Sequence, residues 1–303
     1  MTTRSHDGLS IKNLTTSSSK SRLAILDILR LVAIFFIVTG HLGLGGRIGF
    51  IELGTVGVSL FIFISGMSLE YVYGKGEGLK FLPFFIKRIL RIYPIHVMCL
   101  IVAAIILGSD YLPSDPVEFF LTLTGFCAFA GRWGCRLVET SWFLGLIISL
   151  YLIFPLLSKG LKKHPIGVIL ALFFISVISH EVVRYFYMSM PGRLIEWFPP
   201  CRVFEFGLGI FIARRDSIMK IIEKIKLPAL SHILQYGGNL SFPIFLIHFP
   251  LIAIISFWRN VGGTLLGLSV YFVLTWLISH GLLVVDEWIQ RKIQPIVLSR
   301  ESM

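Results

Sequence analysis

Three ionisable residues lie in an apolar stretch near the start of the chain. Residues 23–41 read LAILDILRLVAIFFIVTGH and contain Asp27, Arg30 and His41. About 20 such residues in a helix match a hydrocarbon core of about 30 Å. Charged and imidazole side chains within a span normally face a bundle interior or a wet cavity, where they mark a reaction site or a transport pathway. The stretch therefore predicts a membrane helix that carries chemistry.

Each of these residues also has a simpler interpretation. Asp27 and Arg30 are three residues apart on one helical face, so they could pair with each other or extend to the membrane interface. His41 lies about 21 Å beyond Asp27 along a helix, and it could be an interfacial residue at the end of the span. Spacing alone leaves both interpretations of His41 open.

A second group of chemically active side chains follows in FFIKRILRIYP, residues 84–94. Lys87, Arg88 and Arg91 recur at spacings of three and four residues, so a helix gives them one basic face near the membrane surface. Such a face could lie on anionic lipid head groups. It could also bind the phosphates of a soluble ligand, since the guanidinium forks of Arg88 and Arg91 suit bidentate contacts.

The composition identifies the class of protein that must position these residues. Hydrophobic residues make up 55% of the chain and charged residues 15%, which is typical of an integral membrane protein with several spans. The net charge of +11 does not indicate nucleic-acid binding, because the basic residues lie in short segments between apolar runs. The fold class is therefore all-α, a polytopic transmembrane helix bundle.

Nine apolar runs are expected to be helical, because lipid offers unpaired backbone groups no partner. The runs are 23–42, 53–73, 82–108, 116–130, 141–158, 165–187, 201–213, 238–258 and 262–285. If 116–130 enters the membrane and returns without crossing, 20 Lys and Arg side chains lie on the cytoplasmic side and seven on the other. We therefore expect about eight spans plus one re-entrant or interfacial helix, although 201–213 is short for a span.

The remaining boundaries follow from this topology. Residues 1–22 are polar and rich in Ser and Thr, and predict a disordered cytoplasmic tail. Residues 23–290 form one membrane domain, and residues 291–303 form a second cytoplasmic tail. Three cysteines, Cys127, Cys135 and Cys201, fall toward the outer side, where a disulfide among them is possible but unassigned. No CxxC pair indicates a metal site.

Six fragments in this order, across about 225 residues, resemble the motifs of the acyltransferase 3 family of integral membrane O-acyltransferases. The fragments are the first span with Asp27, Arg30 and His41; VGVSLFIFISG, ending in Ser65 and Gly66; KRILRIYP, with Arg88, Arg91 and Pro94; SWFLGLIISLYLIFPLL, with Trp142, Tyr151 and Pro155; RVFEFGLGIFIA, with Arg202 and Glu205; and LSFPIFLIHFP, with Ser241 and His248.

The resemblance implies transfer of an acyl group, most often acetyl, from a coenzyme A thioester on the cytoplasmic side to a hydroxyl on the outer side. Acetyl-CoA or another acyl-CoA would be a donor substrate, with no permanently bound cofactor. The acceptor would be a cell-envelope sugar, a glycolipid or a small hydroxylated molecule. The lipid bilayer would be that of a bacterial inner membrane, and both termini would be cytoplasmic.

Roles for individual residues follow from the same resemblance. His41 would be the general base, since imidazole titrates near neutral pH, and Asp27 and His248 would assist the catalytic step. The remaining site residues fall into two groups. Donor binding would use Arg30, Lys87, Arg88 and Arg91, and substrate binding would use Trp142, Tyr151, Arg202, Glu205 and Ser241.

The chain departs from the family pattern at one position. The family usually has Glu five residues after the Trp of the fourth fragment, and this chain has Ile147 there. Either the Glu is dispensable, or Glu139, Glu181 or Glu205 takes its role, or activity is altered. A transporter or flippase would also use intramembrane His, Asp and Arg, and a non-catalytic family member is the third alternative. Consumption of acyl-CoA separates the enzyme from both.

Overall fold

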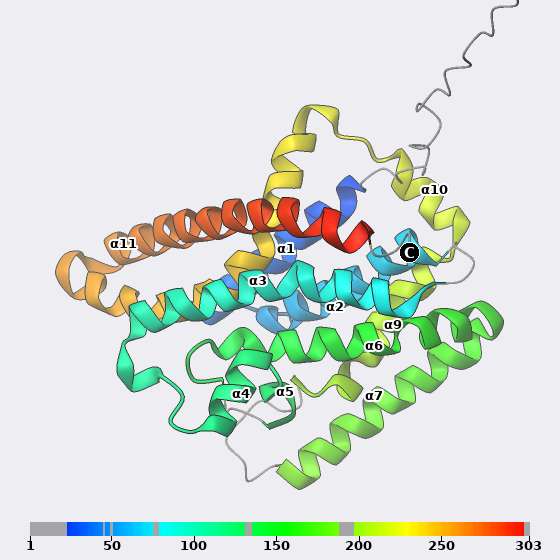
Figure 1. Ribbon diagram of the computed structural model, residues 1–303, viewed down its shortest axis with the longest axis horizontal. Coiled ribbons are helices and arrows are strands. Elements are labelled where there is room, and N and C mark those ends of the chain that lie inside the picture. The colour runs from blue at the N-terminus through cyan, green and yellow to red at the C-terminus, as the bar shows by residue number, and fades with distance from the viewer. Residues whose placement is uncertain are drawn as a thin grey trace, which may run out of the picture.

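The computed structural model describes residues 23–44, 46–48, 51–74, 79–130, 135–187 and 197–299. Ten helices form most of this part of the chain (Figure 1). Their bounds are α1 Ala24–His41, α2 Leu53–Tyr73, α3 Phe81–Leu107, α4 Pro116–Thr124, α5 Cys127–Ala130, α6 Trp142–Lys163, α7 Pro165–Tyr187, α9 Val203–Ala213, α10 Asp216–Lys224 and α11 Ser231–Ser299. The expected tail 1–22 and residues 300–303 lie outside the described residues.

Short elements complete the fold. Single turns of 3-10 helix occur at Ser109–Tyr111, Glu139–Ser141, Pro199–Arg202 and Pro228–Leu230. Between α1 and α2, β1 (Arg47–Ile48) and β2 (Ile51–Glu52) pair antiparallel, with Arg47 opposite Glu52. These elements leave the class unchanged, and the fold is the all-α polytopic bundle expected from the composition.

Seven helices in the described part of the chain are long and apolar enough to cross a membrane. They cover 24–41, 53–73, 81–107, 139–163, 165–186, 228–253 and 262–293. Apart from the 3-10 turn at 228–230, the last two lie in α11, whose backbone is non-helical at Gly262 and Gly263, where the chain turns back on itself (orange in Figure 1). The run 116–130 divides into α4 and α5, neither of which is long enough to span.

The expected count of about eight spans differs by one from the count by length and composition. The run 201–213 forms part of a 3-10 turn and then α9, whose 11 residues extend only about 16 Å. The helix α9 nevertheless packs deeply against α2. A side chain at Gly66 of α2 or at Gly209 of α9 would collide with a backbone carbonyl of the other helix, so small residues permit the close approach.

The core is centred on α6, which runs between α3 and α7 (Figure 1). In the most apolar stretch of the α6 span 72% of the residues are buried, whereas in that of the α7 span only 17% are. Apolar side chains on α7 therefore face outward, among them Phe174 and Ile178, as lipid permits for a peripheral span. The bundle thus surrounds α6 and leaves α7 at its edge.

The cysteines are paired in one of the ways that the sequence left open. Cys127, the first residue of α5, forms a disulfide with Cys135 at a sequence separation of eight. Cys201 is a buried free thiol in the 3-10 turn before α9, and Cys99 is a buried free thiol within α3. No group of three or more potential metal ligands occurs among the residues that were placed.

Candidate active site

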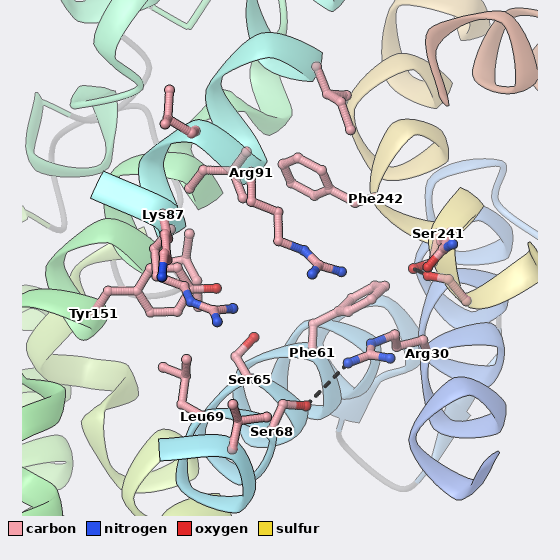
Figure 2. Close-up of a pocket in the computed structure, with 18 of the residues that line it drawn as sticks. Arg30, Phe61, Ser65, Ser68, Leu69, Lys87, Arg91, Tyr151, Ser241 and Phe242 are labelled. Carbon is pink, nitrogen blue, oxygen red and sulfur yellow. Dashed lines mark hydrogen bonds between the residues drawn. The ribbon is translucent and has the colours of Figure 1, made fainter. Parts of the chain in front are cut away.

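A cavity of about 760 Å³ lies between α1, α2, α3, α6 and both halves of α11. Its volume is within the usual range for a small-molecule site, about 300–1,000 Å³. The cavity occupies the end of the bundle where α1 and α3 begin and α2 ends. The helices that carry the two sequence-predicted groups therefore meet around one space (Figure 2).

Four cationic side chains line this cavity. Lys87, Arg88 and Arg91 come from the first turns of α3, and Arg30 comes from α1. Figure 2 shows Arg91 and Arg30 extending into the same space from different helices. The four side chains line one cavity because Lys87, Arg88 and Arg91 share one helical face and α1 lies across the cavity from that face.

Two of these cations are oriented by neighbouring residues. Arg88 donates from Nη2 to the hydroxyl of Tyr73 at 2.7 Å, and its guanidinium carbon lies 5.0 Å from the Tyr73 ring centroid. Arg30 donates to Asp27 Oδ1 at 2.7 Å and to Ser68 Oγ at 3.2 Å. The Asp27–Arg30 pair that the spacing allowed is therefore present. It holds one guanidinium at the cavity wall.

Other polar groups of the wall include two predicted residues and two that sequence reasoning missed. Tyr151 and Ser241 line the cavity, as do Asp286 and Gln290 from the second half of α11. Gln290 Nε2 donates to Leu90 O of α3 and to Asp286 Oδ1. The sequence did hold a signal, because Asp286 and Gln290 are four residues apart and so share one face of a helix. Both lie where the apolar run ends, however, and there they resemble ordinary interfacial residues.

His41 and His248 form a pair away from the cavity wall. His41 Nδ1 lies 3.2 Å from His248 Nε2, although the residues are 207 positions apart. His248 is fully buried, whereas His41 is exposed. The structure thus brings together the two histidines that the sequence proposed for the catalytic step.

Backbone carbonyls fix which nitrogen of each ring carries the proton. His248 Nδ1 lies 2.8 Å from Phe245 O and 3.1 Å from Ile244 O. A carbonyl only accepts, so Nδ1 of the neutral ring is the donor and Nε2 is the acceptor. His41 Nδ1 then donates to His248 Nε2 and to Ile37 O at 3.0 Å. The acceptor nitrogen of His41 is Nε2, the form that a general base requires.

Three predicted substrate-binding residues lie outside the cavity wall. Trp142 is buried against Trp197, with ring centroids 5.5 Å apart and nearly parallel planes. Arg202 donates to Glu205 Oε1 at 2.9 Å and to Ser59 Oγ at 3.1 Å. The contacts of Arg202 and Glu205 with Ser59 join α9 and its preceding turn to α2.

Ile147 lies in the cavity wall, on α6 between Phe143 and Tyr151. The position where the family usually has Glu therefore faces the same space as the cations. None of the three candidates to replace that Glu lines the cavity. Glu205 pairs with Arg202 and Glu181 pairs with Arg184 at the surface, and Glu139 is partly buried in the 3-10 turn before α6. The carboxylates that do reach the cavity in the described chain are those of α11, Asp286 and Glu287.

Comparison with known proteins gives two similar curated sequences. The chain is 26% identical over 217 residues to a regulator of hypoxia-inducible factor 1 from Caenorhabditis elegans, covering 60% of this chain and 43% of that protein. It is 25% identical over 190 residues to the acyltransferase MdmB of Streptomyces mycarofaciens, covering 53% of this chain and 46% of that protein.

The matched regions thus span less than half the length of either relative. No solved structure matches the chain. The family model described as an acyltransferase domain matches residues 23–221, which include α1 through α10 up to Ile221 and so the four cations and His41. With its seven apolar helices, the protein is an integral membrane protein, and it belongs to the acyltransferase 3 family.

Proposed function

We propose that the protein is a membrane O-acyltransferase. It moves an acyl group, acetyl in the first instance, from a coenzyme A thioester at the cytoplasmic face to a hydroxyl of a cell-envelope sugar or glycolipid. The membrane is a bacterial inner membrane. With α9 counted as an eighth crossing beside the seven long helices of the described chain, the number of crossings is even, which puts both termini on the cytoplasmic side. Twenty of the 28 Lys and Arg residues fall on that side in this topology, which supports the orientation.

One observation carries the proposal, namely the cavity that combines a cationic entrance with an apolar interior. The four cations lie at the end of the bundle where α1 and α3 begin, namely Arg30, Lys87, Arg88 and Arg91. Guanidinium and ammonium groups bind phosphates by charge-assisted hydrogen bonds. Phe61, Phe143 and Ile147 line the wall farther along α2 and α6. An anionic head with a long flexible arm and an acyl end, the chemistry of acyl-CoA, fits this gradient.

The histidine pair supplies the proton transfer. His41 Nε2 takes the proton of the acceptor hydroxyl as its oxygen attacks the thioester carbonyl carbon. A carbon–oxygen bond forms, the carbon–sulfur bond breaks, and the imidazolium returns the proton to the leaving thiolate. The products are the O-acyl ester and free coenzyme A, so the atoms and charges balance. His248 accepts from His41 Nδ1 and keeps the ring in the reactive tautomer.

The test uses the full chain purified in detergent and supplied with acetyl-CoA and a glycolipid extract. Release of the coenzyme A thiol is measured together with acylation of the extract by mass spectrometry. Wild-type protein is expected to release one thiol per ester formed, and His41→Ala is expected to lose about 10²–10⁴-fold in rate. His164→Ala changes an exposed histidine after α6 and serves as the matched control.

The rival functions predict other outcomes of the same assay. A transporter or flippase, or a non-catalytic family member, would consume no acyl-CoA at all. Thiol release that is equal in wild type and His41→Ala would remove the general base and leave the donor assignment in place. Absence of thiol release with any acyl-CoA would contradict the proposed function itself.

A further inference from the structure

Three phenylalanine rings from three helices pack together at the cavity wall. Phe61 of α2 and Phe143 of α6 line the cavity wall, and Phe245 of α11 packs against both. The ring centroids are 6.1 Å apart for Phe61 and Phe245, 4.9 Å for Phe143 and Phe245, and 6.4 Å for Phe61 and Phe143. These separations are typical of contacting aromatic pairs, so the three rings form a continuous layer.

This aromatic layer lies between the cavity and the histidine pair. The Phe245 ring centroid is 6.1 Å from that of His248, and His248 is in turn 5.0 Å from His41. The backbone carbonyl of Phe245 also accepts a hydrogen bond from His248 Nδ1. Phe245 therefore contacts both the layer and the pair, and neither His41 nor His248 lines the cavity.

The depth of the layer suits the end of a long ligand. Along α3, Ile95 lies one turn beyond Arg91, and both line the cavity. Along α2, the wall extends from Tyr73 to Phe61, 12 residues or about 18 Å of helix. A donor whose phosphates contact the α3 arginines therefore presents its other end to the phenylalanines.

We propose that Phe61, Phe143 and Phe245 form an aromatic passage that selects the donor by the size of its acyl group. The inference rests on the proposed function, because it names the structural cause of donor choice. An acetyl group displaces these packed rings least on its way toward His41, whereas each further methylene must displace them more. The donor class is then a short, unbranched acyl-CoA thioester.

Steric selection of this kind changes the ratio of kcat/KM values between donors by a measurable factor. One methylene in a hydrophobic pocket changes kcat/KM by about 10–200-fold. Wild-type protein is therefore expected to use acetyl-CoA at least about tenfold better than butyryl-CoA and to use hexanoyl-CoA worse still. Phe61 is the ring to remove, since it is only partly buried, whereas Phe143 and Phe245 are deep in the core.

The experiment compares kcat/KM for acetyl-, butyryl- and hexanoyl-CoA in wild type, Phe61→Ala, Phe61→Leu and Phe35→Ala. Phe35 on α1 is 63% exposed and is the matched control. Phe61→Ala is expected to raise the hexanoyl-to-acetyl ratio by at least about tenfold, Phe61→Leu by less, and Phe35→Ala not at all. The ratio is internal to each variant, so a smaller folded fraction does not alter it.

The outcomes separate this inference from the proposed function. Transfer of acetyl by wild type, with the same chain-length ratio in Phe61→Ala, would overturn the passage and leave the enzyme assignment standing. Equal use of hexanoyl- and acetyl-CoA by wild type would overturn it as well. No transfer of any acyl group by wild type would overturn the proposed function and the passage together.

Discussion

The contact between His41 and His248 predicts a modest and specific loss of rate when the buried histidine is replaced. His41 Nδ1 has two acceptors, His248 Nε2 at 3.2 Å and Ile37 O at 3.0 Å. His248→Leu removes the first and leaves the second, which still holds the proton on Nδ1. Loss of one neutral hydrogen bond, about 0.5–1.5 kcal/mol, lowers kcat by roughly 2- to 13-fold.

The assay is steady-state acyl transfer with kcat and KM measured separately. His248 lies outside the cavity wall, so the KM for acyl-CoA is expected to stay unchanged. His248→Gln offers an amide oxygen as an acceptor for His41 and is expected to recover much of the rate. A fall in kcat as large as that of His41→Ala would show that His248 itself carries the chemistry. An unchanged kcat, or a change confined to KM, would refute the positioning role.

Three further predictions concern donor binding and stability. Arg91→Ala is expected to raise the KM for acyl-CoA about ten- to hundredfold, because it removes a charge-assisted contact; an unchanged KM would place the phosphates elsewhere. Gly238→Ala would put a Cβ 2.5 Å from Asp27 Oδ1, so the thermal midpoint should fall by the equivalent of about 1–3 kcal/mol. Gly281→Ala in the second half of α11 meets open space and should not lower the midpoint. Cys127→Ser opens the eight-residue disulfide loop and should cost about 2–3 kcal/mol in non-reducing thermal melts; equal midpoints would mean that the disulfide does not stabilise the fold.

Most of the helical architecture could be predicted because it depends on local properties. Lipid requires every spanning segment to satisfy its own backbone, so apolar runs of sufficient length become helices. The run 201–213 is an exception to this rule of local properties. Its length is too short for a span by itself, and its burial depends on Gly66 and Gly209, a tertiary contact that hydropathy does not report.

The candidate site was predictable where its residues share one helix. Lys87, Arg88 and Arg91 form a basic face by spacing alone, and Asp27 and Arg30 are within reach of each other. The apposition of His41 and His248 depends on how α11 packs against α1, which spacing cannot give. The resemblance to a known family singled out both histidines, and the packing determines that they form a pair.

Asp286 and Gln290 show where the sequence reasoning stopped. They lie at the end of the last apolar run, where polar residues are normal for an interface. Only the position of α11 beside α3 turns them toward the cavity, where Gln290 donates to Leu90 O. In the same way, the sequence separation of eight between Cys127 and Cys135 fits a short loop, but three cysteines on one side also allowed other pairs, and only the folded chain shows which pair forms.

The most direct test of the account is mass spectrometry of envelope glycans and glycolipids from cells that carry wild-type protein, a deletion, or matched levels of His41→Ala and Arg91→Ala. The account predicts a mass difference of one acyl group that is present with wild type, absent from the deletion and strongly reduced in both variants. That result would also identify the acceptor. An acylation pattern that is identical in wild type and the deletion would contradict transfer to the envelope.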